Sequence, residues 1–139
     1  MNDRSDRWVE VAPSRFDHEI EGLGLVRALL PDEAPFRAWS NFEFMDSSGA
    51  YQEVDLLVLG RRWLHLVELK YLRGRISGDE HRWIRSDGSE MDSPLKLAHR
   101  KAQRLASRLK EQLVRTDSAR IAAAVTIPYV KACVFLHHP

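Results

Sequence analysis

Two charged residues stand two positions apart inside an apolar segment of the chain. Glu68 and Lys70 alternate with leucine and valine in the segment Leu64–Tyr71, LHLVELKY. Successive side chains of a β-strand point to opposite faces, so this spacing places both charges on one face. Charged groups in apolar surroundings are costly unless they are paired or bind a metal ion. The pattern predicts an internal salt bridge, a strand end that emerges into solvent, or a site that performs chemistry.

A second acidic residue, Asp55, precedes the apolar run Leu56–Leu59. The turn-forming residues Gly60-Arg61-Arg62 separate this run from the next apolar segment, which predicts a β-hairpin. Counting outward from the turn places Asp55 across from Glu68, so the two carboxylates can converge. Two convergent carboxylates suit a hard cation such as Mg²⁺ or Mn²⁺. Glu53 shares the face of Asp55, and we expect it to be structural.

A third acidic residue lies in a helix that we predict from Ser14, as its N-cap, to Leu30. At 100° per residue, Glu19 falls inside the apolar stripe of this helix, whereas His18 falls on the side away from the stripe. The stripe consists of Phe16, Ile20, Leu23, Val26 and Leu30. A carboxylate directed at a sheet needs a partner, which would be an arginine, Lys70 or a metal site.

The remaining pattern places these residues on an α/β scaffold. We expect strands at 36–45, 51–59, 63–71 and 130–136, short strands near Ile76 and Trp83-Ile84, and a long helix at 95–115. This order predicts a central mixed β-sheet flanked by helices. Residues 1–13 form an expected N-terminal arm and residues 14–139 one domain. The chain ends three residues after the last expected strand, which leads us to expect a fragment of a longer multidomain protein.

The charge of the chain is polarised although the net charge is only +1. Residues 1–35 carry eight acids and four bases, whereas residues 94–115 carry seven bases and one acid. We take the candidate nucleic-acid-binding residues from this basic helix: Lys96, Arg100, Lys101, Arg104 and Arg108. A basic helix face beside acidic residues is typical of a protein that meets a polyanion and holds a metal ion. The alternative is a solvated helix face.

Composition excludes several other classes of protein. Hydrophobic residues make up 44% and charged residues 29% of the chain, as in globular domains and unlike disordered tails. The start of the chain has no apolar signal core, and no apolar run approaches the ~20 residues that span a bilayer. The single cysteine, Cys133, excludes an internal disulfide and a zinc ribbon. We therefore expect a cytoplasmic protein with no membrane partner.

The ordered set of motifs resembles the nuclease-related domain (NERD) family of the PD-(D/E)XK nuclease superfamily. The resemblance covers roughly residues 14–136 and depends on the helix acid, the strand acid and the Glu-x-Lys pair. It also depends on Gly74, Trp83 and a proline that opens the long helix, Pro94. It implies a restriction-endonuclease-like core and a nuclease that uses Mg²⁺ or Mn²⁺. Asp55, Glu68 and Glu19 would hold the metal, and Lys70 would complete the catalytic set.

The resemblance also carries implications beyond the site. It implies that the partner is nucleic acid, with DNA expected, and that the domain can belong to a bacterial phage-defence protein with further domains. One departure is Leu97, which stands where the family often has a glutamine, and Lys96, His99 or Lys101 could substitute for that glutamine. Two alternatives remain open at this point. One is a catalytically inactive DNA- or partner-binding module fused to a kinase or helicase, and the other is a structural domain with internal salt bridges.

Overall fold

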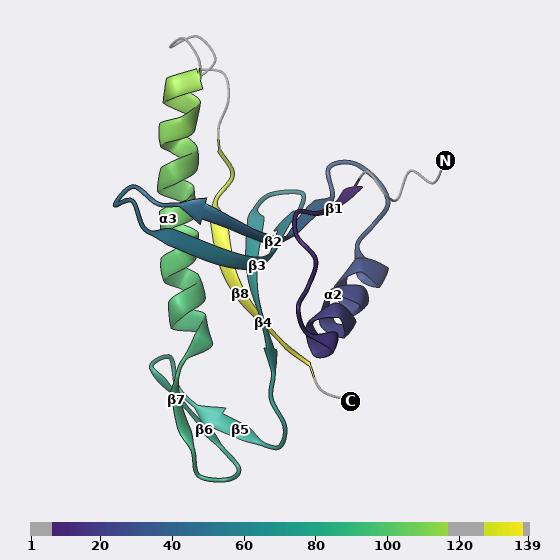
Figure 1. Cartoon of the computed structure of the whole chain (residues 1–139), viewed down its shortest axis with the longest axis vertical. Coiled ribbons are helices and arrows are strands. Elements are labelled where there is room, and N and C mark those ends of the chain that lie inside the picture. Colours follow the sequence, from purple (N-terminus) through teal and green to yellow (C-terminus); the bar gives the residue numbers. More distant parts are fainter. Residues whose placement is uncertain (1–6, 117–126, 138–139) are drawn as a thin grey trace.

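The computed structural model describes residues 7–116 and 127–137, whose core is a mixed five-stranded sheet of order β1-β2-β3-β4-β8 (Figure 1). Its strands are β1 (Trp8–Glu10), β2 (Arg37–Met45), β3 (Tyr51–Leu59), β4 (Leu64–Tyr71) and β8 (Val130–His137). β2, β3 and β4 form an antiparallel meander, while β1 runs parallel to β2 and β8 runs parallel to β4. The predicted α/β fold with a central mixed sheet is confirmed.

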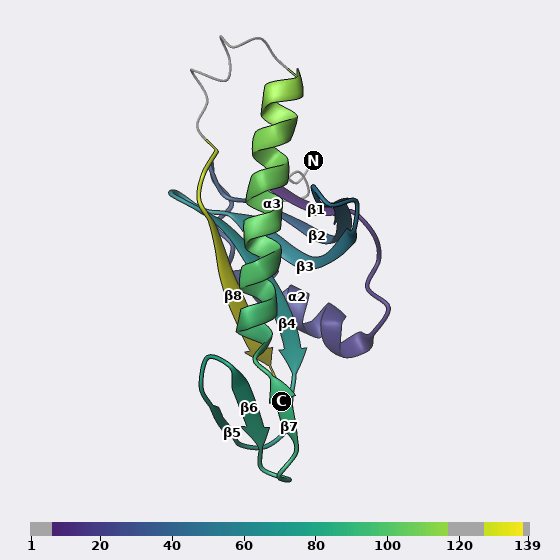
Figure 2. The same ribbon diagram turned by 90° about the vertical axis from the view of Figure 1, so that its left-hand side faces the viewer.

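Two helices cover opposite faces of this sheet, α2 (Asp17–Leu29) and α3 (Pro94–Thr116). Figure 2 shows α3 lying along β4 and β8, with α2 beyond the sheet. α3 packs against Val54, Leu64 and Leu66 in one core cluster. α2 packs through Leu23 in a second cluster, together with Trp8, Ala38 and Leu56. The site residues of β3 and β4 therefore lie in a sheet with an apolar core on each face.

The bounds of the long helix agree closely with those predicted from the spacing of its apolar residues. Residues 95–115 were expected, and the helix runs from Pro94 to Thr116. Proline is tolerated in the first turn of a helix because its missing N–H has no partner there. The buried side chains Ala98, Ala102 and Leu105 recur every three or four residues and face the sheet.

The N-terminal helix differs from its prediction in its start and in its buried face. Its N-cap residue is Phe16 and not Ser14, whose Oγ instead accepts a hydrogen bond from Asn41 Nδ2 at 2.7 Å. Phe16 and Ile20 were expected in the buried stripe, but they are 57% and 55% exposed. The physical reason is a close approach at Gly22, where an added Cβ would lie 2.7 Å from His137 Nε2. The helix thus contacts the sheet through one narrow side.

A small antiparallel sheet of order β5-β6-β7 lies between β4 and α3 in the chain. It comprises β5 (Ile76–Gly78), β6 (Arg82–Arg85) and β7 (Glu90–Asp92), and Figure 1 shows it projecting from one end of the molecule. The short strands expected near Ile76 and Trp83-Ile84 are confirmed, whereas β7 was not predicted. In the part of the chain that the structure describes, no helix is long and apolar enough to cross a membrane.

Candidate functional site

β3 and β4 separate at the level of the acidic residues. Their ladder ends at the pair Leu56–Val67, while β4 remains paired with β8 as far as Tyr71. Continuing the register by one residue places Asp55 opposite Glu68, as the hairpin count predicts. At this fork Asp55 Oδ2 accepts a hydrogen bond of 2.9 Å from the backbone N–H of Leu69. The carboxylate of Asp55 is thus fixed where the two strands part.

The regular alternation of side chains is interrupted at the same level. Val54 packs beneath α3, whereas Leu56 packs with the α2 cluster, although residues two apart on a regular strand share a face. The adjacent strand β2 carries Asn41 at this point, with φ of 54°. Asparagine is one of the few residues that adopt this left-handed conformation readily. The local irregularity lets Asp55 line a pocket together with side chains from both faces.

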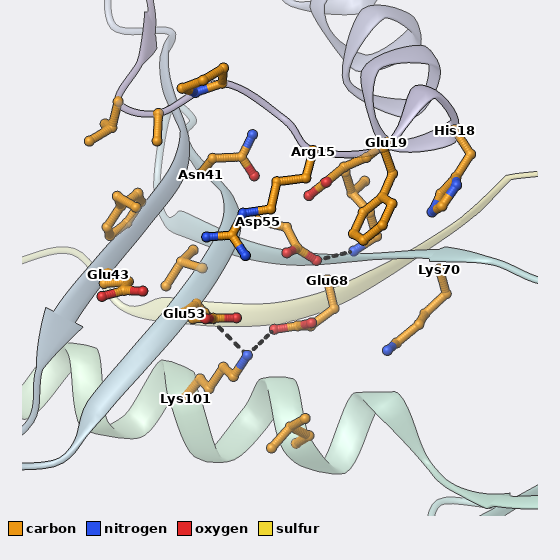
Figure 3. Close-up of a pocket in the computed structure, with 18 residues that line it drawn as sticks. Arg15, His18, Glu19, Asn41, Glu43, Glu53, Asp55, Glu68, Lys70 and Lys101 are labelled. Atoms are coloured by element: carbon orange, nitrogen blue, oxygen red, sulfur yellow. Dashed lines mark hydrogen bonds and ion pairs between the residues drawn. The ribbon is translucent and has the colours of Figure 1, made fainter.

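This pocket has a volume of about 680 Å³ and brings together the four predicted catalytic residues (Figure 3). Asp55 and Glu68 come from the forked strands, Lys70 lies farther along β4, and Glu19 comes from the first turns of α2. Pockets of this size are large enough for small ligands or a nucleotide. The geometry therefore unites the predicted site residues, while their chemical roles stay predictions.

Carboxylates dominate the electrostatics of the pocket. Glu68 is only 5% exposed, and this burial is the main reason that its pKa is raised above 4.5. Burial likewise raises the pKa of Glu19. The negative charge of Asp55 raises both pKa values further. The charge of Asp55 thus hinders the ionisation of Glu19 and Glu68, and a cation bound among these carboxylates would offset that repulsion.

The raised pKa of Glu19 makes a testable prediction about stability in the absence of metal. Because the folded protein holds this proton more tightly than the unfolded chain, ionisation of Glu19 destabilises the fold as pH rises from 4.5 through the raised folded pKa. We expect Glu19→Gln to melt at a higher temperature than the wild type at neutral pH. The difference should vanish when the pH is lowered below 4.5. Thermal melts in EDTA across this pH range measure the difference in melting temperature. A higher melting temperature of Glu19→Gln that persists unchanged below pH 4.5 would contradict a raised pKa of Glu19.

A lysine from α3, and not Lys70, pairs with the buried glutamate. Lys101 Nζ lies 2.8 Å from Glu68 Oε1 and donates a second hydrogen bond of 2.7 Å to the backbone oxygen of Glu53. Both side chains are largely buried, with 13% and 6% exposure for Lys101 and Glu68. Among the described residues, Lys70 forms no ion pair. The internal salt bridge that sequence reasoning offered as an alternative role for Lys70 is made by Lys101.

The strand carboxylates Asp55 and Glu68 share the pocket without belonging to a compact three-ligand cluster. Within residues 7–116 and 127–137, no group of three or more His, Cys, Asp or Glu side chains is arranged to hold a metal ion. Mg²⁺ is commonly bound through one or two carboxylates and several waters, so two strand carboxylates suffice for such a site. Glu19 lines the pocket from the helix side without completing a three-residue set.

The predicted nucleic-acid-binding residues of α3 fall into two groups. Three of them make contacts within the chain: Lys101 with Glu68, Arg104 with Asp46 at 3.7 Å, and Arg108 with the backbone oxygen of Met45 at 3.0 Å. The other two, Lys96 and Arg100, are exposed. Exposed bases near the start of α3 are therefore the better candidates for phosphate contacts.

Arg15, Phe16 and His18 are among the pocket residues that the sequence analysis did not select. Arg15 and Phe16 line the pocket just before α2, and His18 lines it as well, which contradicts the prediction that His18 faces away. The physical reason is that α2 begins at Asp17, so its first turn sits over the end of β4, where His18 stacks on Tyr71. An asparagine inside a strand pattern, Asn41, was a usable signal for the irregular strand, because asparagine is depleted in strands.

Residues 15–137, which include every residue of the pocket from Arg15 onward, match the family model described as "Nuclease-related domain" (NERD). The chain belongs to the NERD family. It is 41% identical over 112 residues to "Probable kinase PglW" of Streptomyces coelicolor. The match covers 78% of this chain and 7% of that protein, so the NERD domain spans a small part of its relative. No solved structure matches the chain.

Leu97 stands at the position where the family resemblance implies a glutamine. Leu97 lies in the pocket wall and is 44% exposed. Lys101, one helical turn later, lies in the same wall and reaches Glu68. Of the three substitutes that the sequence offered, Lys101 lines the pocket, whereas Lys96 and His99 do not. Of these three residues, Lys101 is therefore the one that lies beside Glu68.

Proposed function

We propose that this NERD domain is a divalent-metal-dependent nuclease that hydrolyses phosphodiester bonds, with DNA as the expected substrate. One observation carries the proposal: Asp55 and Glu68 flank a strand fork and share a pocket with Lys70, which is not engaged in the buried ion pair. Membership of a nuclease-related family supports the same conclusion. The expectation of a place in a bacterial phage-defence protein rests on the family resemblance alone.

The donor set fits Mg²⁺ or Mn²⁺, because both cations prefer carboxylate oxygens. Asp55 and Glu68 would hold the ion, and Glu19 would support it from the helix side. When bound, a divalent cation neutralises charge on the phosphate and lowers the pKa of a bound water. Lys70 would orient the attacking water and stabilise negative charge that develops on the phosphoryl oxygens. The pocket walls would position the scissile bond between these groups.

Cleavage assays test the proposal directly. Supercoiled plasmid, single-stranded DNA and RNA are incubated with the purified chain in Mg²⁺, in Mn²⁺ and in EDTA. We expect cleavage of DNA with either cation, none in EDTA, and none with Glu68→Gln. Cleavage that survives both EDTA and Glu68→Gln would overturn the proposal.

A second candidate function is a non-catalytic module that binds DNA or a protein partner. Two observations favour it: Lys101 forms an ion pair with Glu68, and Leu97 stands where the family resemblance implies a glutamine. It is also compatible with a relative that is named a kinase and is far longer than this chain. Binding of DNA without cleavage under any metal condition would support this alternative.

Exposed bases of α3 should give non-specific affinity for nucleic acid. Replacing Lys96 and Arg100 with alanine should weaken DNA binding and reduce the slope of log K against log salt by about one unit per lost phosphate contact. Arg61→Ala is a matched control, because Arg61 is exposed in the β3–β4 turn and pairs with Glu33. Fluorescence anisotropy at several salt concentrations measures both quantities. Equal slopes for the wild type and the double variant would show that Lys96 and Arg100 are only solvated and do not contact phosphates.

A further inference from the structure

Phe16 occupies a position that neither core packing nor helix capping explains. It is the N-cap residue of α2 and makes no side-chain capping hydrogen bond. Serine, threonine, aspartate and asparagine are favoured at N-caps because their side chains bond the free N–H groups, which phenylalanine cannot do. The side chain is also 57% exposed, so it contributes little to the core. An exposed aromatic ring at an unfavourable position suggests a binding role.

The ring of Phe16 is the outer member of a stack that reaches the catalytic strand. Its centroid lies 5.4 Å from that of His18, and the two rings are 14° from parallel. His18 in turn stacks on Tyr71 at 5.0 Å, with the two ring planes 26° apart. Tyr71 follows Lys70 directly in β4 and contacts the buried ring of His137. The stack thus anchors an exposed ring to the strand that carries Glu68 and Lys70.

The same rings lie in the wall of the candidate catalytic pocket. Phe16 and His18 line it together with Asp55, Glu68 and Lys70. Figure 3 shows His18 above Lys70, on the side of the pocket where α2 begins. Among the described residues, His18 is the one ring that stacks on Phe16. Because Phe16 is 57% exposed, a large part of its side chain stays available to a planar ligand in the pocket.

We propose that Phe16 is a stacking platform for an unpaired nucleobase next to the phosphate held at Asp55 and Glu68. Aromatic side chains bind single strands by base stacking, which tolerates any sequence because every base has a π face. Inside a duplex, both faces of a base are covered by neighbouring base pairs, so the platform selects single strands, frayed ends or flaps. The inference rests on the proposed function for the position of the phosphate, and it adds the substrate class that the pocket accepts.

Binding of a fluorescent base analogue tests this inference without requiring cleavage. Single strands and duplexes of about 15 nucleotides, within the range of known single-strand sites, carry one 2-aminopurine near an end. They are titrated with the full 139-residue chain in Ca²⁺, and their integrity is checked by gel. We expect the single strand to bind more tightly than the duplex, with 2-aminopurine fluorescence altered by stacking. Phe16→Ala should weaken single-strand binding roughly five-fold to a hundred-fold.

Matched variants distinguish stacking from general hydrophobic contact. Phe16→Trp should retain the affinity, whereas Phe16→Leu should lose it, because leucine keeps apolar area but has no π face. Leu29→Ala removes an apolar side chain that is 81% exposed on the same helix and should have no effect. Equal losses for single strand and duplex, or full affinity in Phe16→Leu, would overturn the inference. If the chain binds single strands through Phe16 but never cleaves them, the proposed nuclease activity is refuted and the stacking role of Phe16 is retained.

Discussion

We expect Lys70→Ala to lower the rate of phosphodiester cleavage by about 10²–10³-fold, the usual cost of removing one group that stabilises transition-state charge. Lys70 lines the pocket beside Glu68, and among the described residues it forms no ion pair, so its loss breaks no buried salt bridge. The melting temperature should therefore change little. Binding of Mn²⁺ should persist or strengthen, because a positive charge beside the metal site is removed. Single-turnover cleavage, thermal melts and calorimetry on one preparation give all three quantities.

Lys101→Met is the matched control for this variant. Lys101 is the lysine that pairs with Glu68, so its replacement leaves a buried carboxylate without its partner. Removing one member of a buried pair costs up to ~3–5 kcal/mol of folding free energy. If Lys70→Ala instead produced the loss of stability and kept full cleavage, Lys70 would be a structural residue and the proposed mechanism would be wrong.

Asp55→Asn should abolish cleavage and remove metal-induced stabilisation. The asparagine oxygen can still accept the Leu69 N–H, so the substitution removes charge while keeping the hydrogen bond of 2.9 Å at the strand fork. In EDTA the variant should melt at a higher temperature than the wild type, because the charge that raises the pKa values of Glu19 and Glu68 is gone. The wild type should gain ~2.7 kcal/mol at a Mn²⁺ concentration 100 times Kd, and the variant almost nothing.

Thermal melts of both proteins over a series of Mn²⁺ concentrations measure this effect. The Arg61→Ala variant serves again as a surface control, since its side chain pairs with Glu33 on the exterior. A variant that melts lower than the wild type in EDTA and responds equally to Mn²⁺ would show that Asp55 serves the fold and not a metal site.

Sequence reasoning predicted most of the strands because their patterns are local. The hairpin of β3 and β4 follows from two apolar runs and a turn, and the count from that turn gave the register that places Asp55 opposite Glu68. The Glu-x-Lys spacing and the period of α3 are likewise local. For these reasons the sequence predicts that Asp55 and Glu68 converge, and the structure places both in one pocket with Glu19 and Lys70.

Long-range contacts were beyond the reach of the sequence. The apolar period of α3 places Lys101 at the border of the buried stripe and Arg100 opposite it, but it does not predict that Lys101 reaches the buried Glu68. The predicted start of α2 was wrong because Ser14 Oγ accepts a hydrogen bond from Asn41 and does not cap the helix. The N-cap lies two residues later than predicted, so Phe16 precedes the helix, and both Phe16 and His18 of the first turn line the pocket. Both features depend on how separate elements meet, which side-chain periodicity does not encode.

Calorimetric titration of Mn²⁺ into the wild-type chain and into Glu68→Gln tests the central claim most directly, because it examines the metal site apart from turnover. We expect saturable binding to the wild type and loss of that binding in Glu68→Gln, while thermal melts show that both proteins are folded. Absence of saturable binding to the wild type, or equal binding to both proteins, would contradict a metal centre at the fork of β3 and β4.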